Sequence, residues 1–501
     1  MTFPATDGIT DRLQALFAYD ASSPLIFSSG LFLFLFAGFL LVYSAFRRAP
    51  MARIVYVIAF SLYFYYKSSG IYFLLLVFAA ASDFLIARGI YRARFRWTKR
   101  WLVVLSVAVN LGMLGYFKYT NFLIDISNQL FGQGFLQFQN IFLPVGISFF
   151  VFQSMSYTID IYRGQLKPLS NWLDYLFYLS FFPQLVAGPI VRARDFIPQI
   201  RQNPVVVTRE MFGTGVFLIL TGLFKKAIIS DYISLNFVDR IFDEPLLYSG
   251  FECLMGIYGY ALQIYCDFSG YSDMAIGLAL LLGFRFPKNF DSPYKSATIT
   301  EFWRRWHISL SSWLKDYLYI SLGGNRKGKA RTYLNLFLTM LIGGLWHGAA
   351  IRFVLWGTLH GVALALHKLW LSVVPGAKVS GYQMHPLSRL AGILVTFHLV
   401  CFGWLLFRAD SMRTVQLMLH QITDNFHLQL LPQMLAGYGG VFALVGLGYL
   451  LHMLPGRADA AARRAVVASP FWVQVLLLAS VAWGVMQIQS SSIQPFIYFQ
   501  F

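Results

Sequence analysis

The stretch "GGLWHGAAIRFVLWGTLHG", Gly343 to Gly361, places two histidines among leucine, tryptophan, phenylalanine and valine. Such an apolar segment is typical of a membrane interior, where a histidine is costly to bury without a partner, a water-lined cavity or a function. Gly343, Gly344 and Gly348 permit close backbone approach or a helix break beside His347. The stretch therefore predicts a membrane fold with a polar or reactive centre, and it favours a function for His347.

Composition places the whole chain in the same class. Of its 501 residues, 57% are hydrophobic and only 12% are charged, whereas a soluble protein carries about twice that charged share. The net charge of +18 fits lysines and arginines in short cytoplasmic loops. It does not indicate a nucleic-acid partner, because no soluble basic domain is visible. The three cysteines are scattered and predict neither a disulfide framework nor a metal site.

The chain divides into a short polar lead-in and one membrane domain. Residues 1–23 are polar, and the apolar run 24–46 is long enough to span a membrane. Arginine clusters at 47–53 and 88–100 bracket an apolar hairpin, which places both clusters in the cytoplasm and the N-terminus outside. We expect residues 24–501 to form a single membrane domain, with its motif-bearing core at about 141–370.

Further apolar runs are candidate spans, although several are too short or too polar to cross alone. They lie at about 54–66, 71–87, 101–117, 141–160, 171–188, 211–229, 250–266, 273–284, 333–348, 351–372, 390–407, 437–454 and 470–489. Residues 267–331 are the least like lipid-facing helix, and polar backbone at membrane depth needs surrounding protein or water. We expect re-entrant or half-buried helices there, around a cavity.

The stretch "TEFWRRWHISLSSWLKDYLYISLGGN", residues 300–325, contains the next candidates. On one continuous helix, Arg304, His307 and Ser311 would share a stripe. Trp303 and Trp306 would fall on a neighbouring stripe with Leu310 and Trp313. An interfacial amphipathic helix explains the tryptophans and arginines equally well, but such a helix needs no imidazole at position 307.

Two histidines of the opening stretch have different expected roles. His360 lies 13 residues after His347, so in a continuous helix it would face largely away from it, and the spacing does not suit a metal pair. For His360 we favour a structural hydrogen bond inside the helix bundle, because buried polar groups need partners.

Two other stretches carry polar residues among apolar ones. "YCDFSGYSDMAIG" contains Asp267 and Ser269, and intramembrane carboxylates are functional candidates. Asp267 and Asp273 could equally pair with Arg285, Arg304 or Lys295, and we favour that structural role. In "FFPQLVAGPIVRARDF", prolines and a glycine break a helix beside Arg192 and Arg194, which could bind an anionic cofactor or anchor the span.

Four stretches together resemble the membrane-bound O-acyltransferase (MBOAT) family, in its bacterial alginate O-acetyltransferase membrane-subunit branch. Kin of that branch act in D-alanyl transfer to teichoic acids and in cellulose and peptidoglycan acetylation. The stretches are "FFPQLVAGPI", "YCDFSGYSDMAIGLALLLGFRFPKNFDSPYKS", "ITEFWRRWHISLSSWLKDYLYISLGGNRKG" and "GGLWHGAAIRFVLWGTLHG". The resemblance covers about residues 24–410. The N-terminal lead-in departs from the pattern, which leaves the polysaccharide system open.

The resemblance implies an all-α fold of about 11 membrane helices, with re-entrant or half-buried helices around a central tunnel. It implies a hallmark histidine, matched by His347, and a second essential one, matched by His307. The substrate tunnel and donor site would be lined by Arg304, Trp303, Trp306, Ser311, Trp346, Asp267, Ser269, Arg192 and Arg194.

The resemblance also implies a mechanism. A cytoplasmic acyl thioester, acetyl-CoA in the simplest case, would be the donor substrate, with no bound cofactor. His347, kept neutral by burial, would take the proton of the attacking hydroxyl, and His307 would orient the thioester carbonyl or stabilise its developing charge. An extracytoplasmic SGNH-type acyltransferase would receive the acyl group for an exopolysaccharide, alginate-like or cellulose, at the bacterial inner membrane.

Two other functions remain open from the residues alone. A lipid or glycan flippase would show internal symmetry and broken helices in matching halves, which the sequence does not show. A polyprenyl-linked glycosyltransferase would need an outward-facing acidic metal site, but acidic residues are sparse here and Asp267 and Asp273 would lie about 120° apart on a helix.

Overall fold

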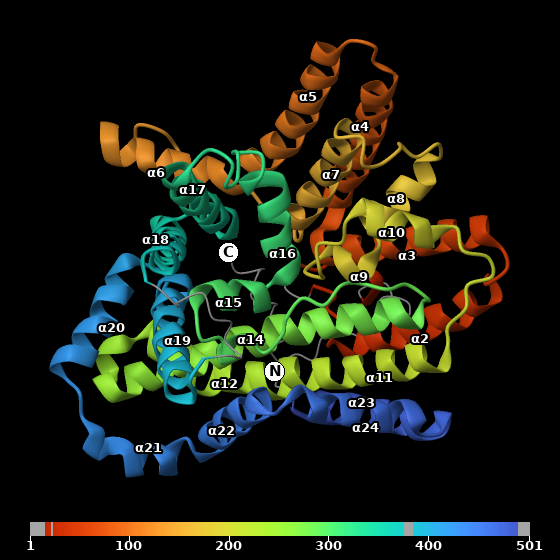
Figure 1. Ribbon diagram of the computed structural model, residues 1–501. Coiled ribbons are helices and arrows are strands. Elements are labelled where there is room, and N and C mark those ends of the chain that lie inside the picture. The colour runs from red at the N-terminus through yellow and green to blue at the C-terminus, as the bar shows by residue number, and fades with distance from the viewer. Residues whose placement is uncertain (1–15, 22–23, 375–383, 489–501) are drawn as a thin grey trace, which may run out of the picture.

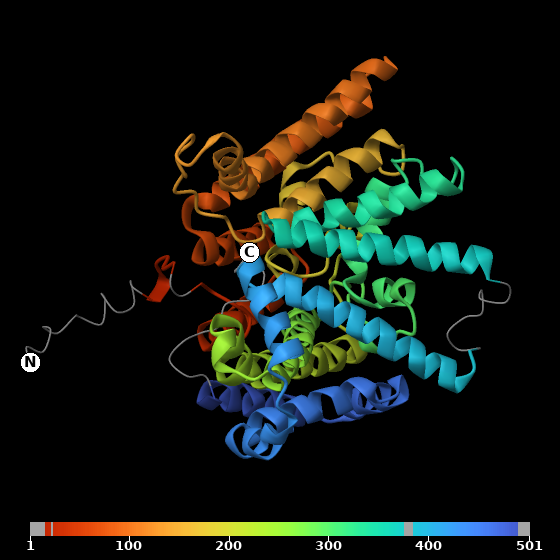
Figure 2. The ribbon, with the colours of Figure 1, turned by 90° about the vertical axis from the view of Figure 1, so that its left-hand side faces the viewer.

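The computed structural model describes residues 16–21, 24–374 and 384–488, and every regular element in those ranges is a helix (Figures 1 and 2). This confirms the predicted all-α class. Most of the predicted lead-in, residues 1–23, lies outside the described residues. In the labels, α marks an α-helix and η a short 3₁₀- or π-helix.

The N-terminal half contains α2 (Gly30–Ala45), α3 (Pro50–Ser69), η1 (Gly70–Tyr72), α4 (Phe73–Arg92), α5 (Arg96–Leu114), η2 (Gly115–Tyr119), α6 (Thr120–Phe131), α7 (Ile147–Tyr162), α8 (Trp172–Ser180), α9 (Phe182–Leu185), α10 (Ala193–Ile200), α11 (Arg209–Leu223), η3 (Phe224–Ser230), α12 (Asp231–Ile233), η4 (Ser234–Val238), α13 (Asp239–Asp243) and η5 (Pro245–Leu247). The C-terminal half contains α14 (Gly250–Leu281), η6 (Pro293–Lys295), α15 (Ile299–Arg305), α16 (Ile308–Trp313), η7 (Leu314–Tyr319), α17 (Lys329–His347), α18 (Ile351–Val373), α19 (Pro386–Arg408), α20 (Met412–Asp424), η8 (Leu428–Leu430), α21 (Leu431–Gly437), α22 (Gly439–Met453), α23 (Gly456–Ala468) and α24 (Phe471–Ile488).

Four helical segments of the described chain are long and apolar enough to cross a membrane, and two bent pairs raise the number to six if each pair is one span. The four are Pro50–Arg92, Arg96–Phe131, Arg209–Asp243 and Pro386–Arg408. The predicted count of about 11 is therefore not confirmed. Short helices contribute to the difference: α2 has 16 residues, about 24 Å of helix against a hydrocarbon core of about 30 Å.

Helix α14 runs through the middle of the molecule beside α11 (Figure 1). It begins at a capping box in which Ser249 and Glu252 each accept a hydrogen bond from the other's backbone N–H. The sequence predicted two separate spans, 250–266 and 273–284, but α14 continues through both for 32 residues. The prediction was wrong because polar residues of the intervening stretch find partners on neighbouring elements, so the helix need not break.

Paired glycines bring α11 and α14 into close contact. A Cβ atom on Gly222 would lie 2.6 Å from the Gly270 carbonyl oxygen, and one on Gly277 would lie 2.6 Å from the Gly215 carbonyl oxygen. Real side chains at these positions would force the two backbones apart. The glycines are seven residues apart in each helix, so they form one seam between the two helices.

Helices α17 and α18 form an antiparallel hairpin, and α19 packs against both α18 and α14 (Figure 2). Their bounds confirm the predicted runs 333–348 and 351–372. A side chain on Gly344 would overlap the Phe353 carbonyl oxygen, and one on Gly357 would lie 2.6 Å from the Met340 carbonyl oxygen. The glycine-rich sequence therefore permits the close backbone approach that was expected.

Candidate active site

His347 is the last residue of α17, and its position is fixed from outside the helix. The Lys118 ammonium donates hydrogen bonds of 2.8 Å to the carbonyl oxygens of Trp346 and His347. The Tyr119 hydroxyl donates one of 2.6 Å to the Leu345 carbonyl. These are carbonyls that a helix leaves unpaired at its C-terminus. The helix thus ends at a defined residue, with the His347 side chain buried.

His307 lies at a break between α15 and α16. Its backbone has φ = +41°, a left-handed conformation that is unusual for a residue with a side chain and that costs about 1–3 kcal/mol. The predicted continuous helix was therefore wrong, and with it the shared stripe: Arg304 is exposed, whereas His307 is fully buried.

The indole of Trp346 contacts both histidines. The ring centroids of His307 and Trp346 are 6.3 Å apart, and those of Trp346 and His347 are 5.0 Å apart. The indole N–H donates to the Ser148 carbonyl at 3.3 Å, which ties it to α7. Two helix breaks that are 40 residues apart in sequence thus place both imidazoles against one ring.

His360 lies nearer to His347 than the sequence predicted. Because the chain reverses between α17 and α18, the Trp356 ring contacts both imidazoles, at centroid distances of 4.9 Å from His347 and 4.6 Å from His360. Neither ring nitrogen of His360 has a hydrogen-bond partner in the described chain, so the expected structural hydrogen bond is absent there. Instead, His360 packs against Gly403: a Cβ atom built on Gly403 would lie 3.0 Å from Nε2 of His360.

The other candidates from residues 300–325 separate in space. Trp303 packs against His360 and Trp356, whereas Trp306 packs against Trp404, with centroids 4.8 Å apart. The Ser311 hydroxyl donates to the Trp306 carbonyl at 3.2 Å. Trp303 therefore adjoins His360, and Trp306 packs against Trp404 instead. Ser311 supports the break at His307.

Asp267 is paired, but not with a partner that the sequence suggested. Its carboxylate lies 2.5 Å from the Lys226 ammonium, which also binds Asp231 at 2.7 Å, and Lys225 binds Asp273 at 2.7 Å. The predicted structural role fits these contacts, but the predicted partners Arg285, Arg304 and Lys295 were wrong. Both lysines lie on the π-helical η3, a type of distortion that changes which way consecutive side chains point. Ser269 is buried on α14.

Arg192 and Arg194 differ in their surroundings. Arg192 forms an ion pair of 2.7 Å with Asp316 of η7, and its guanidinium lies over the Tyr317 ring. Arg194 is exposed, with its nearest carboxylate, Asp195, 3.9 Å away. Of the two, Arg194 is therefore the one whose charge faces solvent.

A narrow pocket reaches the Trp346 side of the site. Its lining includes Lys118, Ser148, Phe149, Val186 and Trp346. Phe149 packs between Trp346 and His307, at centroid distances of 5.4 and 6.4 Å. A larger pocket of about 650 Å3 lies between α11 and α23 and contains none of the predicted site residues. A continuous central tunnel remains a prediction.

Sequence reasoning missed four residues that shape this site: Lys118, Tyr119, Asn289 and Trp356. Lys118 and Tyr119 directly follow the predicted span 101–117, whereas residues 115–131 are helical. A lysine directly after an apolar run was the available signal. Asn289 gave none, because its role depends on contacts 18 and 20 residues away. Among the described residues, no group of three or more His, Cys, Asp or Glu could hold a metal.

Comparison with known proteins identifies the family of this chain. Residues 127–405 match the family model of MBOAT, the membrane-bound O-acyltransferase family. A probable alginate O-acetylase of Pseudomonas putida is 38% identical over 503 residues, covering 95% of this chain and all of that protein. A peptidoglycan O-acetyltransferase of Helicobacter pylori is 36% identical over 420 residues, 78% of each chain. A teichoic acid D-alanyltransferase of Bacillus subtilis is 28% identical over 282 residues, 54% of this chain and 69% of that protein. The chain therefore belongs to the membrane-bound O-acyltransferase family and is a multi-pass membrane O-acyltransferase.

Proposed function

We propose that the protein moves an acetyl group from a cytoplasmic thioester to an acceptor outside the membrane. The observation that carries the proposal is the placement of two buried imidazoles, His307 and His347, against the Trp346 indole. Acyl transfer to a hydroxyl needs one group to take a proton and another to orient or stabilise the reacting carbonyl. Two neighbouring imidazoles can supply both. The apolar rings around them limit access of water, which would otherwise hydrolyse the thioester.

The donor in this proposal is acetyl-CoA, which is a substrate and not a bound cofactor. Its phosphates suit exposed basic side chains. Arg194, Arg326, Lys327, Lys329 and Arg331 are all exposed. Arg192 contacts η7, which leads into the loop that carries Arg326 and Lys327. Because Arg192 is already paired with Asp316, we assign it to holding this rim in place and the exposed residues to attracting the donor.

The acceptor in this proposal is a separate extracytoplasmic SGNH-type acyltransferase, which passes the acetyl group to an exopolysaccharide. His307 and His347 are 0% and 3% exposed, so a wide hydrated polysaccharide strand would have to shed its water to reach them. A narrow side chain or chain terminus of a protein could reach the histidines without stripping the water from a whole strand. The Pseudomonas putida relative is named for alginate, so an alginate-like polymer is the first candidate and cellulose the second. The protein would lie in the bacterial inner membrane with its N-terminus outside.

Reconstitution in liposomes tests the proposal. Labelled acetyl-CoA is supplied on the cytoplasmic face, and alginate is supplied on the other face with or without the purified partner. We expect thioester consumption, and labelled polymer only when the partner is present. Full-rate labelling of alginate without a second protein would contradict the relay. A failure to consume acetyl-CoA under all conditions would contradict acetyl transfer itself.

The donor rim has a test of its own. Arg194→Gln should raise the KM for acetyl-CoA several-fold at unchanged kcat, because a solvent-facing charge acts on donor binding. Arg413→Gln, which removes an exposed arginine of α20, is the matched control and should leave KM unchanged. Equal KM values for the two variants would leave Arg194 with only an anchoring role.

A further inference from the structure

The hydrogen bonds of Asn289 determine which nitrogen of His307 carries the proton. The Asn289 side-chain oxygen, Oδ1, faces the backbone N–H of Ser309 at 3.2 Å. Because a backbone N–H can only donate, the atom facing it must be the oxygen of the amide. At the other end of the amide, Nδ2 donates to the Ser272 hydroxyl of α14 at 3.0 Å. The orientation of the Asn289 amide is thereby fixed at both ends.

The same oxygen lies 3.2 Å from Nδ1 of His307. A carbonyl oxygen only accepts, so Nδ1 must carry the hydrogen. The Ser309 hydroxyl does not compete: it accepts from the Ile190 backbone N–H at 3.0 Å and donates to Asn289 Oδ1 at 2.9 Å. A neutral imidazole has one N–H, so Nε2 of His307 keeps its lone pair.

Nε2 of His307 is buried and has no hydrogen-bond partner in the described chain. Aromatic rings surround the imidazole, namely Phe149, Phe268, Phe290 and Trp346. The neighbouring titratable side chain is His347, whose ring packs against the same Trp346 indole. A free basic nitrogen in apolar surroundings is suited to accept a proton, and in this form it cannot donate a hydrogen bond to an oxyanion.

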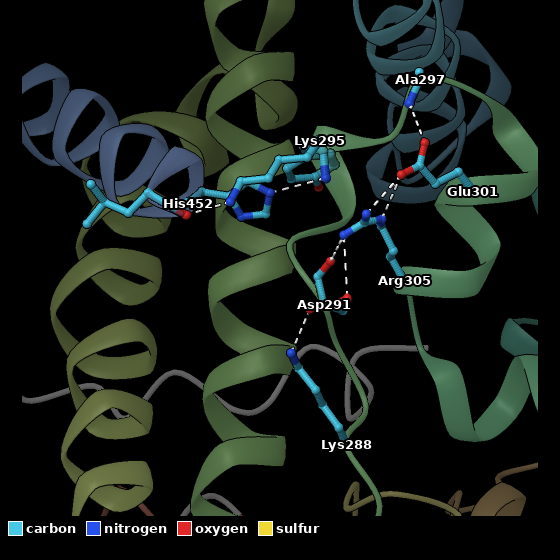
Figure 3. A network of polar contacts seen from close by, with 9 residues as sticks. Lys288, Asp291, Lys295, Ala297, Glu301, Arg305 and His452 are labelled. Carbon is cyan, nitrogen blue, oxygen red and sulfur yellow. Dashed lines mark hydrogen bonds and ion pairs between the residues drawn. The ribbon is translucent and has the colours of Figure 1, made fainter. Parts of the chain in front are cut away.

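The segment around Asn289 is held in place independently. Lys288 binds the Asp291 carboxylate at 2.6 Å, and Arg305 binds the Asp291 carbonyl at 3.0 Å and Glu301 at 2.9 Å (Figure 3). The Ile308 backbone N–H donates to the Asn289 carbonyl at 2.9 Å. Asn289 is therefore attached by its main chain and its side chain to the residues that follow the break at His307.

We propose that Asn289 is a positioning residue that fixes the Nδ1–H form of His307, and that Nε2 of His307 takes the proton of the attacking hydroxyl. As the O–H bond breaks, the hydroxyl oxygen bonds to the thioester carbonyl carbon and the C–S bond breaks. The proton then passes from Nε2 to the leaving thiolate, so the products are an ester and a free thiol. This assignment rests on the proposed function, and it reverses the roles that the sequence suggested for His307 and His347.

The test uses purified full-length protein in liposomes, with thiol release from acetyl-CoA measured against pH. Asn289→Asp keeps an acceptor for Nδ1–H and adds a negative charge beside the imidazole. A protonated imidazole is then favoured, so the acidic limb of the kcat profile should move up by about one pH unit or more. Asn289→Ala removes the acceptor and should lower kcat about 10- to 100-fold, the loss typical when a metal-bound histidine loses the partner that orients it.

Ser272→Ala is the matched control, because it removes the partner of the Asn289 amide nitrogen but leaves Oδ1 in place. It should keep the acidic limb of the kcat–pH profile at its wild-type position and a kcat within about two-fold of wild type. Thermal melting shows which variants fold. A folded Asn289→Asp protein that is inactive or keeps the wild-type limb overturns the proposal, as does wild-type kcat in Asn289→Ala. Full activity in His307→Ala would instead refute the use of His307 in the proposed function.

Discussion

Two breaks in the helices place the two site histidines, and they are built in different ways. The 348 break, residues 348–350, follows His347 and depends on glycine, because a side chain on Gly348 would overlap the Phe353 ring. The 307 break, at residues 306–307, contains no glycine. His307 itself adopts the left-handed conformation, and the Asn289 side chain of the 282–298 loop hydrogen-bonds to His307 and to the Ser309 side chain beside it. A break determined by residue type can be recognised in a sequence, whereas one imposed by distant hydrogen bonds cannot.

The largest expected effect removes the two imidazoles. His347→Ala and His307→Ala should each reduce acyl transfer to background, because each deletes a group that reaches the reacting atoms in the proposed site. Removal of a stabilising donor alone typically costs about 100- to 1000-fold in rate. Thiol release from acetyl-CoA measures the loss, and size-exclusion profiles and melting temperatures show whether the fold is intact.

His360→Ala provides the control for that experiment. His360 has the same chemistry and also contacts Trp356. The Trp356 ring connects it to His347, whereas the Trp346 indole connects His347 to His307. We expect a lower melting temperature with most of the transfer rate retained. If His360→Ala is as inactive as His347→Ala while fully folded, the site extends to a third histidine and the two-break description is incomplete.

The next effect concerns the hairpin that leads into the 348 break. Gly344→Ala should destabilise the protein by about 1–3 kcal/mol, the usual cost of overpacking, because its side chain meets backbone of α18 that cannot move aside. Gly343→Ala is the matched control: its Cβ would lie 3.2 Å from the end of the Leu314 side chain, which can rotate. Thermal unfolding in detergent compares them. Equal melting temperatures would mean that the glycine contact does not determine the hairpin.

The same contrast explains how much of the fold the sequence could predict. The bounds of α17 and α18 followed from apolar length and glycine, and they were correct to within a few residues. The continuity of α14 was missed, because it depends on Lys225 and Lys226 neutralising two carboxylates more than forty residues away. Periodicity shows that a polar residue lies among apolar ones, but not which distant charge will pair with it.

For the candidate site, residue chemistry was a better guide than helical geometry. His347 and His307 were chosen because of their type and their setting, Trp346 was implied by the family resemblance, and the structure brings the three together. The shared stripe of Arg304, His307 and Ser311 assumed a continuous helix and was wrong. Nothing in "WRRWHISL" shows that the backbone becomes left-handed at its histidine. Asn289 holds that conformation, and Asn289 lies in a separate loop.

A smaller effect is expected at the support of α17. Lys118→Met should lower kcat about 10-fold, because it frees the carbonyls of Trp346 and His347 and lets the catalytic end of the helix shift; small misplacements of this kind can cost up to about 100-fold. Tyr119→Phe, which removes one neutral hydrogen bond to Leu345, should have a weaker effect. Steady-state kinetics of both variants test this order. A larger loss in Tyr119→Phe would show that Lys118 is not the main support of the 348 break.

The smallest effect distinguishes the two interpretations of Ser311. The sequence placed this residue in the substrate tunnel, whereas its hydroxyl donates to the Trp306 carbonyl directly before the 307 break. A neutral hydrogen bond contributes about 1 kcal/mol, so Ser311→Ala should lower stability by about that amount and leave kcat and KM unchanged. Ser312→Ala is the control, since that hydroxyl donates to the Ser309 carbonyl within α16. Suppose that Ser311→Ala changes the KM for acetyl-CoA at wild-type stability and that Ser312→Ala does not. Ser311 then contacts the donor, and Asn289 holds the 307 break without help from Ser311.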